Sequence, residues 1–133
     1  MKYMLDTNIC IGIIRQNSSK LIQRLITCTP GDVGVSSITI AELAHGAQKS
    51  SQTQKNMAAL EQFLLPLEIA DFDQQASMIY GIIRAKLEQE GNRIGAMDML
   101  IGAHALSMDI TLVTHNPNEF HRIQNLKLDD WML

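Results

Sequence analysis

The stretch GAMDMLIGAHALSMDITLVT, residues 95–114, decides the class of fold. Its first part is apolar over a length typical of a helix, and we expect a helix from about Ala96 to Ser107. Its last part, ITLVT, is a short run rich in β-branched residues, which predicts a strand at 110–114. A helix that leads into a short apolar strand is the repeating unit of α/β proteins with a parallel sheet.

The same alternation extends outward from this stretch in both directions. Strands are expected at 2–5, 33–36, 67–70 and near 126–128, and helices at 7–15, 19–28, 39–49, 53–65 and 73–90. The four clearer strands show no regular alternation of apolar and polar residues, as expected when helices cover both faces of a sheet. The sequence therefore predicts an α/β three-layer sandwich with a mainly parallel sheet flanked by helices.

Composition sets the class of protein. A chain of 133 residues with 46% hydrophobic residues predicts one packed domain, 1–133. The net charge of -3 argues against broad nucleic-acid binding, although a bound divalent metal would still attract phosphate. Cys10 and Cys28 lack metal-ligand spacing and are predicted to be reduced core residues. Without a signal peptide or a membrane span, we expect a cytoplasmic protein with no membrane contact.

Three acids occupy notable places in this pattern. Asp6 directly follows the first strand, at the carboxyl edge of the sheet, where function sits in such folds; helix capping is an equally good interpretation. Glu42 lies one turn above the same edge, but Thr39 and Glu42 also form a capping box. Asp98 is flanked by core-forming residues, and burying a carboxylate there is costly unless it is paired or bound to metal.

A fourth ligand is sought after the strand at 110–114, where Asn116 and Glu119 follow. Several converging carboxylates repel one another unless a cation lies between them. All-oxygen ligands suit Mg²⁺ or Mn²⁺, and such a site activates water for attack on a phosphodiester. The sequence offers no serine or cysteine nucleophile motif that would compete with this interpretation.

The remaining polar residues carry weaker signals. The histidines (His45, His104, His115 and His121) lack zinc-site spacing; His104 is expected to pack in the core, whereas His115 is a candidate for proton transfer. Several basic residues either line an entry face for RNA or form ordinary helix surface: Arg15, Lys20, Arg24, Arg84, Lys86 and Arg93.

Four blocks resemble PIN-domain ribonucleases, most closely the VapC toxins of bacterial toxin–antitoxin pairs. The blocks are MLDTN (4–8), SSITIAELAHGAQKS (36–50), GAMDMLIGAHALSMDITLVTHNPNEFHRI (95–123) and DDW (129–131). The resemblance implies a PIN fold and cleavage of RNA, commonly tRNA, with Mg²⁺ or Mn²⁺, which inhibits translation. It also implies a homodimer and a cognate antitoxin protein whose tail occupies the site.

The resemblance also implies roles for individual residues. Asp6, Glu42 and Asp98 match the family's first three catalytic acids, with Asp6 and Asp98 as the firmest metal ligands. The fourth acid is replaced by the amide of Asn116, so Glu119 is favoured as the fourth catalytic residue. The polar surround of the site is matched by Thr7, Asn8, Ser37, Thr114 and Asn116. The helices at 39–49 and 53–65 correspond to the antitoxin-binding region, with Leu43, Leu60, Phe63 and Leu64 as contact candidates; plain core packing explains them equally.

Other functions fit the sequence less well. A PIN-like module that has lost catalysis and only docks a protein or RNA partner is the main alternative, but all three central acids are present. A receiver-type phosphoacceptor domain needs an acidic pair after the first strand, where only Asp6 occurs. A haloacid-dehalogenase-type phosphatase needs Asp-x-Asp, and Asn8 occupies the second position.

Overall fold

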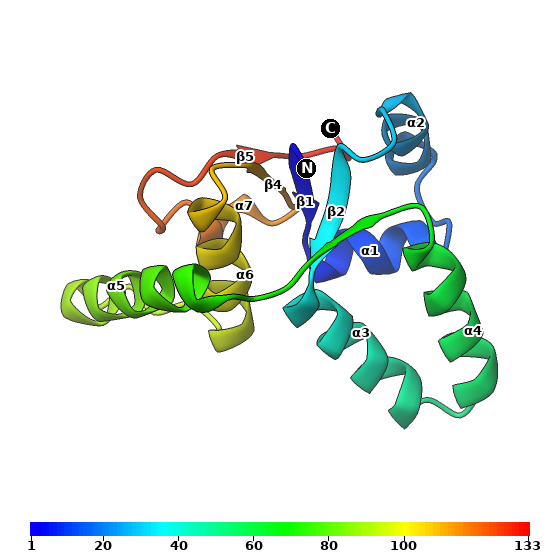
Figure 1. Cartoon of the computed structure of the whole chain (residues 1–133), viewed down its shortest axis with the longest axis horizontal. Coiled ribbons are helices and arrows are strands. Elements are labelled where there is room, and N and C mark those ends of the chain that lie inside the picture. Colours follow the sequence, from blue (N-terminus) through cyan, green and yellow to red (C-terminus); the bar gives the residue numbers. More distant parts are fainter.

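A single five-stranded sheet forms the centre of the computed structural model, which describes residues 1–133 (Figure 1). The strands are β1 (Tyr3–Leu5), β2 (Val33–Ser36), β3 (Glu68–Ala70), β4 (Thr111–Val113) and β5 (Leu128–Asp129). Their order is β3-β2-β1-β4-β5, and every neighbouring pair is parallel. The predicted sheet is confirmed and is wholly parallel; its last strand starts two residues later than expected.

Seven helices surround the sheet. They are α1 (Thr7–Ile14), α2 (Ser19–Thr27), α3 (Ser37–Lys49), α4 (Thr53–Leu64), α5 (Gln74–Glu90), α6 (Ala96–Ser107) and α7 (Pro117–Phe120). In Figure 1, α5 and α6 lie on one side of the strands, and α1, α3 and α4 lie on the other. This arrangement is the three-layer sandwich that the sequence predicts.

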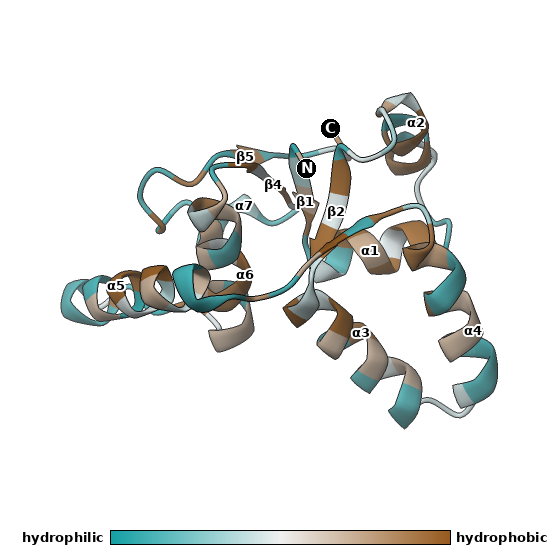
Figure 2. Ribbon diagram, in the orientation of Figure 1, coloured by the Kyte–Doolittle hydropathy of each residue, from teal (hydrophilic) through white to brown (hydrophobic).

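Successive residues of the central strands supply two separate hydrophobic cores. Met4 and Leu112 point into the core under α5 and α6, whereas Leu5 and Val113 point into the core under α1, α2 and α4. This follows from strand geometry, in which neighbouring side chains lie on opposite faces. Figure 2 shows the resulting hydrophobic colouring of β2 and of the helix surfaces near the sheet.

The strands β1, β2 and β4 end at one edge of the sheet. Leu5 is paired with Val113, and the N–H of Asp6 donates a 3.0 Å hydrogen bond to the carbonyl of Val113. Asp6 and Thr114 therefore leave the sheet side by side. Since α1 and α3 begin directly after β1 and β2, their first turns lie at this same carboxyl edge.

The start of α3 differs from the prediction. The helix begins at Ser37, and its N-cap is Ser36, whose hydroxyl accepts a 3.0 Å hydrogen bond from the N–H of Ile38. Thr39 lies inside the helix and is fully buried. The expected capping box of Thr39 and Glu42 is therefore wrong, and Glu42 is free of a capping role.

The two cysteines, both predicted to be reduced core residues, differ in burial. Cys10 and Cys28 are both free thiols, and Cys10 is fully buried as predicted. Cys28 is only half-buried, because it lies at the exposed C-terminal end of α2; the prediction of a core residue is wrong there.

The candidates for antitoxin contact lie in or against the core. Leu43 and Leu60 belong to the buried core, and Phe63 and Leu64 are partly buried and pack against it. No helix has both the length and the apolar composition to cross a membrane.

Candidate active site

Asp6 is the most buried of the predicted acids, with 5% of its surface exposed. It is the N-cap of α1, and its Oδ1 accepts a 2.8 Å hydrogen bond from the N–H of Ile9. Burial raises the pKa of Asp6, and the nearby charge of Glu42 adds to this, while hydrogen bonds from Thr114 and from backbone N–H groups oppose it. Capping is thus observed, and it fixes the carboxylate at the sheet edge.

Glu42 reaches the same place from α3. The hydroxyl of Thr7, in the first turn of α1, donates a 2.6 Å hydrogen bond to Oε1 of Glu42. The side chain is half-buried, so this bond restricts its rotamers at the mouth of the site. The residue after Asp6 therefore positions the second acid.

Asp98 and Glu119 meet from two different helices. Asp98 lies in the first turn of α6, and Glu119 lies in the short helix α7 that follows β4. Partial burial raises the pKa of Asp98 to about 6, assisted by a hydrogen bond with Glu119 and by the charges of Glu119, Asp6 and Glu42. All four predicted acids therefore lie close enough for the charges of the other three to affect the pKa of Asp98.

The four acids have no basic partner. The carboxylates in salt bridges are those of Asp32, Glu88, Asp109, Asp129 and Asp130, and none of them belongs to the site. Like charges at close range raise one another's pKa, and a cation between them removes this penalty. The site is electrostatically suited to bind a cation.

The predicted polar surround divides into two groups. Thr7 contacts Glu42, the backbone N–H of Asn8 favours ionised Asp6, and the fully buried Thr114 interacts with Asp6. The N–H of Asn116 donates to the hydroxyl of Thr114, which leaves the hydroxyl hydrogen of Thr114 for Asp6. These four residues surround the acids.

Ser37 makes its hydrogen bond outside this group, and its supporting role at the site stays a prediction. Its hydroxyl accepts a 3.0 Å hydrogen bond from the N–H of Phe72, so it fixes the chain between β3 and α5. It begins α3 directly after the N-cap, and its side chain is directed to that loop instead of to the acids.

His104 has a role that sequence reasoning did not find. Its Nδ1 lies 2.8 Å from the hydroxyl of Ser36, the N-cap of α3, and its ring packs edge-on against Phe72 with centroids 5.3 Å apart. Because the Ser36 oxygen already accepts from Ile38, its hydrogen is available to Nδ1. Burial lowers the pKa of His104, which favours this neutral form. The prediction of a satisfied core histidine is confirmed, and the bond also joins the helices that carry Asp98 and Glu42.

His115 is engaged elsewhere. Its exposed ring lies 3.0 Å from a carboxylate oxygen of Asp130 near the C-terminus. This pairing explains its position without any contact to the four acids, and the hypothesis of proton transfer gains no support.

Comparison with known proteins identifies the family. The PIN domain family model matches residues 3–126. The chain belongs to the PIN-domain family. Ribonuclease VapC2 of Rickettsia felis is 42% identical over 132 residues, which cover 98% of each chain. The tRNA(fMet)-specific endonuclease VapC of Salmonella typhimurium is 40% identical over 131 residues, again with 98% of each chain covered.

Solved structures agree with this PIN-domain assignment. The chain matches a crystal structure of DNA-bound VapBC from Salmonella typhimurium with a TM-score of 0.94 and 39% identity, over 98% of both chains. It matches VapBC2 of Rickettsia felis, bound to a promoter DNA fragment, with a TM-score of 0.90 and 41% identity, over 98% of this chain and 99% of that chain.

PIN-domain ribonucleases generally depend on a divalent metal ion, and the donor set of this PIN domain fits one. The donors are carboxylate oxygens, which hard divalent cations prefer. No three acidic, histidine or cysteine side chains lie close enough to form a complete ligand cluster. An ion of the Mg²⁺ type is commonly held by one or two carboxylates while it keeps several waters, so the arrangement suits such binding.

Proposed function

We propose that the protein is a toxin endoribonuclease that hydrolyses RNA phosphodiester bonds with Mg²⁺ or Mn²⁺. The observation that carries the proposal is the convergence of Asp6, Glu42, Asp98 and Glu119 without a basic partner. Partial burial first, and then the neighbouring acids, raise the pKa of Asp98 to about 6. Asp6 and Asp98 would hold the metal. When bound, the ion would polarise the phosphate and lower the pKa of a coordinated water.

The protein's own residues supply positioning and proton acceptance in this proposal. The N–H of Ile9 and the hydroxyl of Thr114 donate hydrogen bonds to Asp6, which favour its ionised form and oppose the effect of burial. The hydroxyl of Thr7 orients Glu42 towards the site. Glu42 and Glu119 would order the attacking water, and a carboxylate oxygen of Glu119 would accept its proton.

The substrate and partners are proposed from the relatives. The names of two relatives specify a tRNA(fMet) endonuclease, so we propose tRNA as the substrate and inhibition of translation as the outcome. The similar structures from Rickettsia felis and Salmonella typhimurium are VapBC complexes, which supports a cognate antitoxin protein as a partner. We place this activity in the cytoplasm.

We also propose a homodimer. Met78 and Ile82 lie one turn apart on α5 and are 67% and 66% exposed, so they form an apolar stripe that a second copy would cover. Light scattering of the wild type and of a Met78→Gln/Ile82→Gln variant tests this. We expect a dimer for the wild type and a monomer for the variant; two equal masses would contradict this interface.

The deciding experiment measures cleavage of total tRNA and of a structured control RNA. Wild type, Asp6→Asn and Asp98→Asn are compared with Mg²⁺, with Mn²⁺ and with chelator, and Glu61→Gln provides an exposed acid outside the site as a control. We expect cleavage only by wild type and Glu61→Gln, and only with metal. Equal activity of the Asp6 and Asp98 variants would refute the site. Inactivity of the wild type on every RNA, with tight partner binding retained, would instead indicate a catalytically silent docking module.

A further inference from the structure

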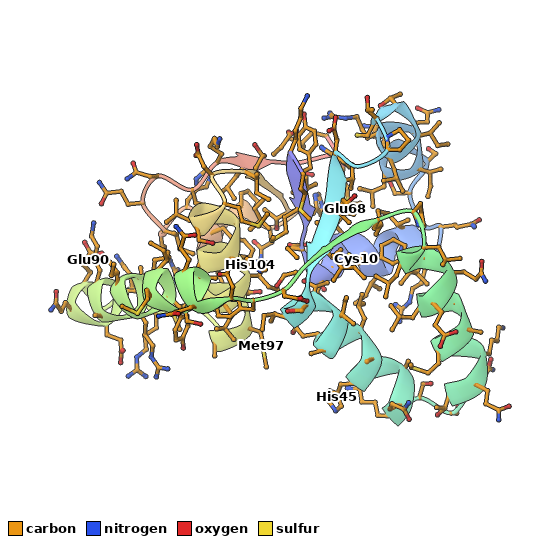
Figure 3. The ribbon with its side chains drawn as sticks, viewed as in Figure 1. Cys10, His45, Glu68, Glu90, Met97 and His104 are labelled. Atoms are coloured by element: carbon orange, nitrogen blue, oxygen red, sulfur yellow. The ribbon has the colours of Figure 1, made fainter.

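A pocket of about 860 Å³ is lined by Glu42, one of the four acids, and by residues next to Asp6 and Asp98. Its walls come from α1, α3 and α4, and Met97 of α6, next to Asp98, closes one side. Figure 3 marks Met97 at the end of α6 and His45 on α3. Glu42 and its partner Thr7 line the pocket, so it is continuous with the candidate active site.

The charge of the pocket lining becomes more positive along α3 and along α1 with distance from the acids. On α3, Glu42, His45 and Lys49 follow at helical spacing on the face that lines the pocket. On α1, Thr7 and Asn8 line the end near the acids, and Arg15 lines the far end. A rise of 1.5 Å per residue places Lys49 about 10 Å along the helix from Glu42.

The cations at the far end have no partner in the structure. Seven of the eleven lysines and arginines form a salt bridge or a side-chain hydrogen bond. The others are Arg15, Lys20, Lys49 and Lys55, and two of these four, Arg15 and Lys49, line the pocket. Arg15 and Lys49 each lie at a helix C-terminus, where a cation also interacts favourably with the helix dipole by roughly 0.3–1 kcal/mol. That effect explains their position on the helices but not their convergence on one pocket.

We propose that Arg15 and Lys49 bind backbone phosphates of the RNA strand next to the bond that is cut. This inference rests on the proposed ribonuclease function. If the reacting phosphate of an RNA strand lies at the acids, the neighbouring phosphates must lie away from that negative charge. The pocket leads from the acids to two unpaired cations, Arg15 and Lys49. Phosphate contacts of this kind position a nucleic acid without reading its sequence. Arg15 and Lys49 are therefore positioning residues.

The walls of the pocket support recognition of the backbone. Ile11, Ile14 and Leu60 are aliphatic, and no phenylalanine, tyrosine or tryptophan lines the pocket. Stacking on aromatic rings is the usual way in which proteins hold single-stranded bases. Because the pocket offers only the small ring of His45 for stacking, binding at this end depends mainly on charge, and we expect it to be sensitive to salt and insensitive to sequence.

Binding of fluorescently labelled total tRNA, measured by anisotropy with chelator present and over roughly 50 to 200 mM salt, tests the proposal without cleavage. The variant is Arg15→Gln/Lys49→Gln, and the matched control is Lys20→Gln/Lys55→Gln, which removes the same charge from exposed residues outside the pocket. We expect the slope of log Kd against log salt to fall by about 2 only in the pocket variant, about 1 for each lost phosphate contact. In cleavage assays its KM should rise several-fold with kcat unchanged.

Further comparisons keep the result interpretable. The charge-preserving variant Arg15→Lys/Lys49→Arg should bind RNA like the wild type, and thermal melting verifies that all variants are folded. Equal effects of the pocket and control variants would overturn the proposal. So would unchanged RNA binding by the pocket variant together with lost antitoxin binding, since the pocket would then hold a protein segment. A wild type that binds RNA with the expected slope but never cuts it would refute the proposed catalysis and leave the phosphate contacts supported.

Discussion

The hydroxyl of Thr7 donates a 2.6 Å hydrogen bond to Oε1 of Glu42 and so joins the first turn of α1 to α3 at the carboxyl edge of the sheet. The two residues are 35 positions apart in the chain. Because Thr7 follows Asp6 directly, one short segment fixes two of the four acids. This relationship makes Thr7 a positioning residue.

Substitution Thr7→Val keeps the shape of the side chain but removes the donor. A hydrogen bond to a charged group contributes about 1.5 kcal/mol, which corresponds to about a tenfold fall in kcat if it is lost from positioning of Glu42. Single-turnover cleavage of tRNA measures this. Thr7→Ser retains the hydroxyl and should restore most of the rate; equal defects in the two variants would show that the hydroxyl is not the cause.

The raised pKa of Asp98 predicts how the metal-free protein responds to pH. Its pKa is 3.8 as a free side chain and about 6 in the folded protein, so the folded state holds more protons between these values. Stability of the metal-free protein should therefore fall as pH rises from about 4 to above 6. Asp98 is half-exposed, and after allowance for solvent screening we expect the penalty at neutral pH to be about 1 kcal/mol.

Thermal melting with chelator checks this pH dependence. The variant Asp98→Asn should be more stable than the wild type at neutral pH and equal to it near pH 4. Added Mg²⁺ or Mn²⁺ should raise the Tm of the wild type more than that of Asp98→Asn. The exposed control Glu61→Gln should follow the wild type throughout. A wild type whose stability is flat across this range would contradict the raised pKa of Asp98.

Ser36 and His104 form a second link between the helices of the site, with opposite pH dependence. Burial lowers the pKa of His104 below 6.5, so the unfolded chain binds its proton first as the pH falls. This contribution to stability is therefore present above pH 6.5 and is lost as the pH falls through the lower pKa of the folded state. His104→Asn does not titrate and should lack this loss in urea unfolding measured across the same pH range.

Ser36→Ala tests the same link at neutral pH. It removes the cap of Ile38 and leaves Nδ1 of the buried His104 without its partner, at a cost of roughly 1–3 kcal/mol in the free energy of unfolding. Urea denaturation compares it with Ser19→Ala, which changes an exposed serine in the first turn of α2. Equal stabilities of the two variants would contradict the proposed bonding of Ser36.

These links also explain which parts of the molecule could be predicted from the sequence. Asp6 and Asp98 could be placed because local patterns fix where a strand ends and a helix starts, and parallel strands bring those ends to one edge. The start of α3 could not be predicted, because Ser36, Ser37 and Thr39 all carry hydroxyl groups that can cap a helix. The choice of Ser36 depends on the register of β2 with β3, in which Ser36 pairs with Ala70.

Hydrogen bonds between residues far apart in the chain could not be predicted from the sequence. Ser37 was expected near the acids, but its bond to Phe72 depends on a loop 35 residues away. The bond of His104 to Ser36 spans 68 residues, and nothing in the apolar pattern of α6 indicates its partner. Periodicity shows which face of an element is buried; it does not show which polar group meets it there.

Trp131 ends the DDW segment and is buried in the fold. Its ring is 1% exposed, packs edge-on against Tyr3 with centroids 5.4 Å apart, and has the guanidinium of Arg24 5.2 Å from its centre. Its Nε1 donates a 3.2 Å hydrogen bond to Asp129 in the edge strand β5. The C-terminus therefore covers the end of the core formed by β1 and α2.

Truncation of this ring by Trp131→Ala should lower the free energy of unfolding by about 3–5 kcal/mol, because it leaves a cavity in that core and frees β5. Trp131→Phe retains most of the packing and should lose less, and Leu133→Ala, at a position 88% exposed, should change nothing measurable. Urea denaturation supplies the midpoint and slope for each variant. If Trp131→Ala were as stable as Leu133→Ala, the C-terminal segment would not belong to the packed fold.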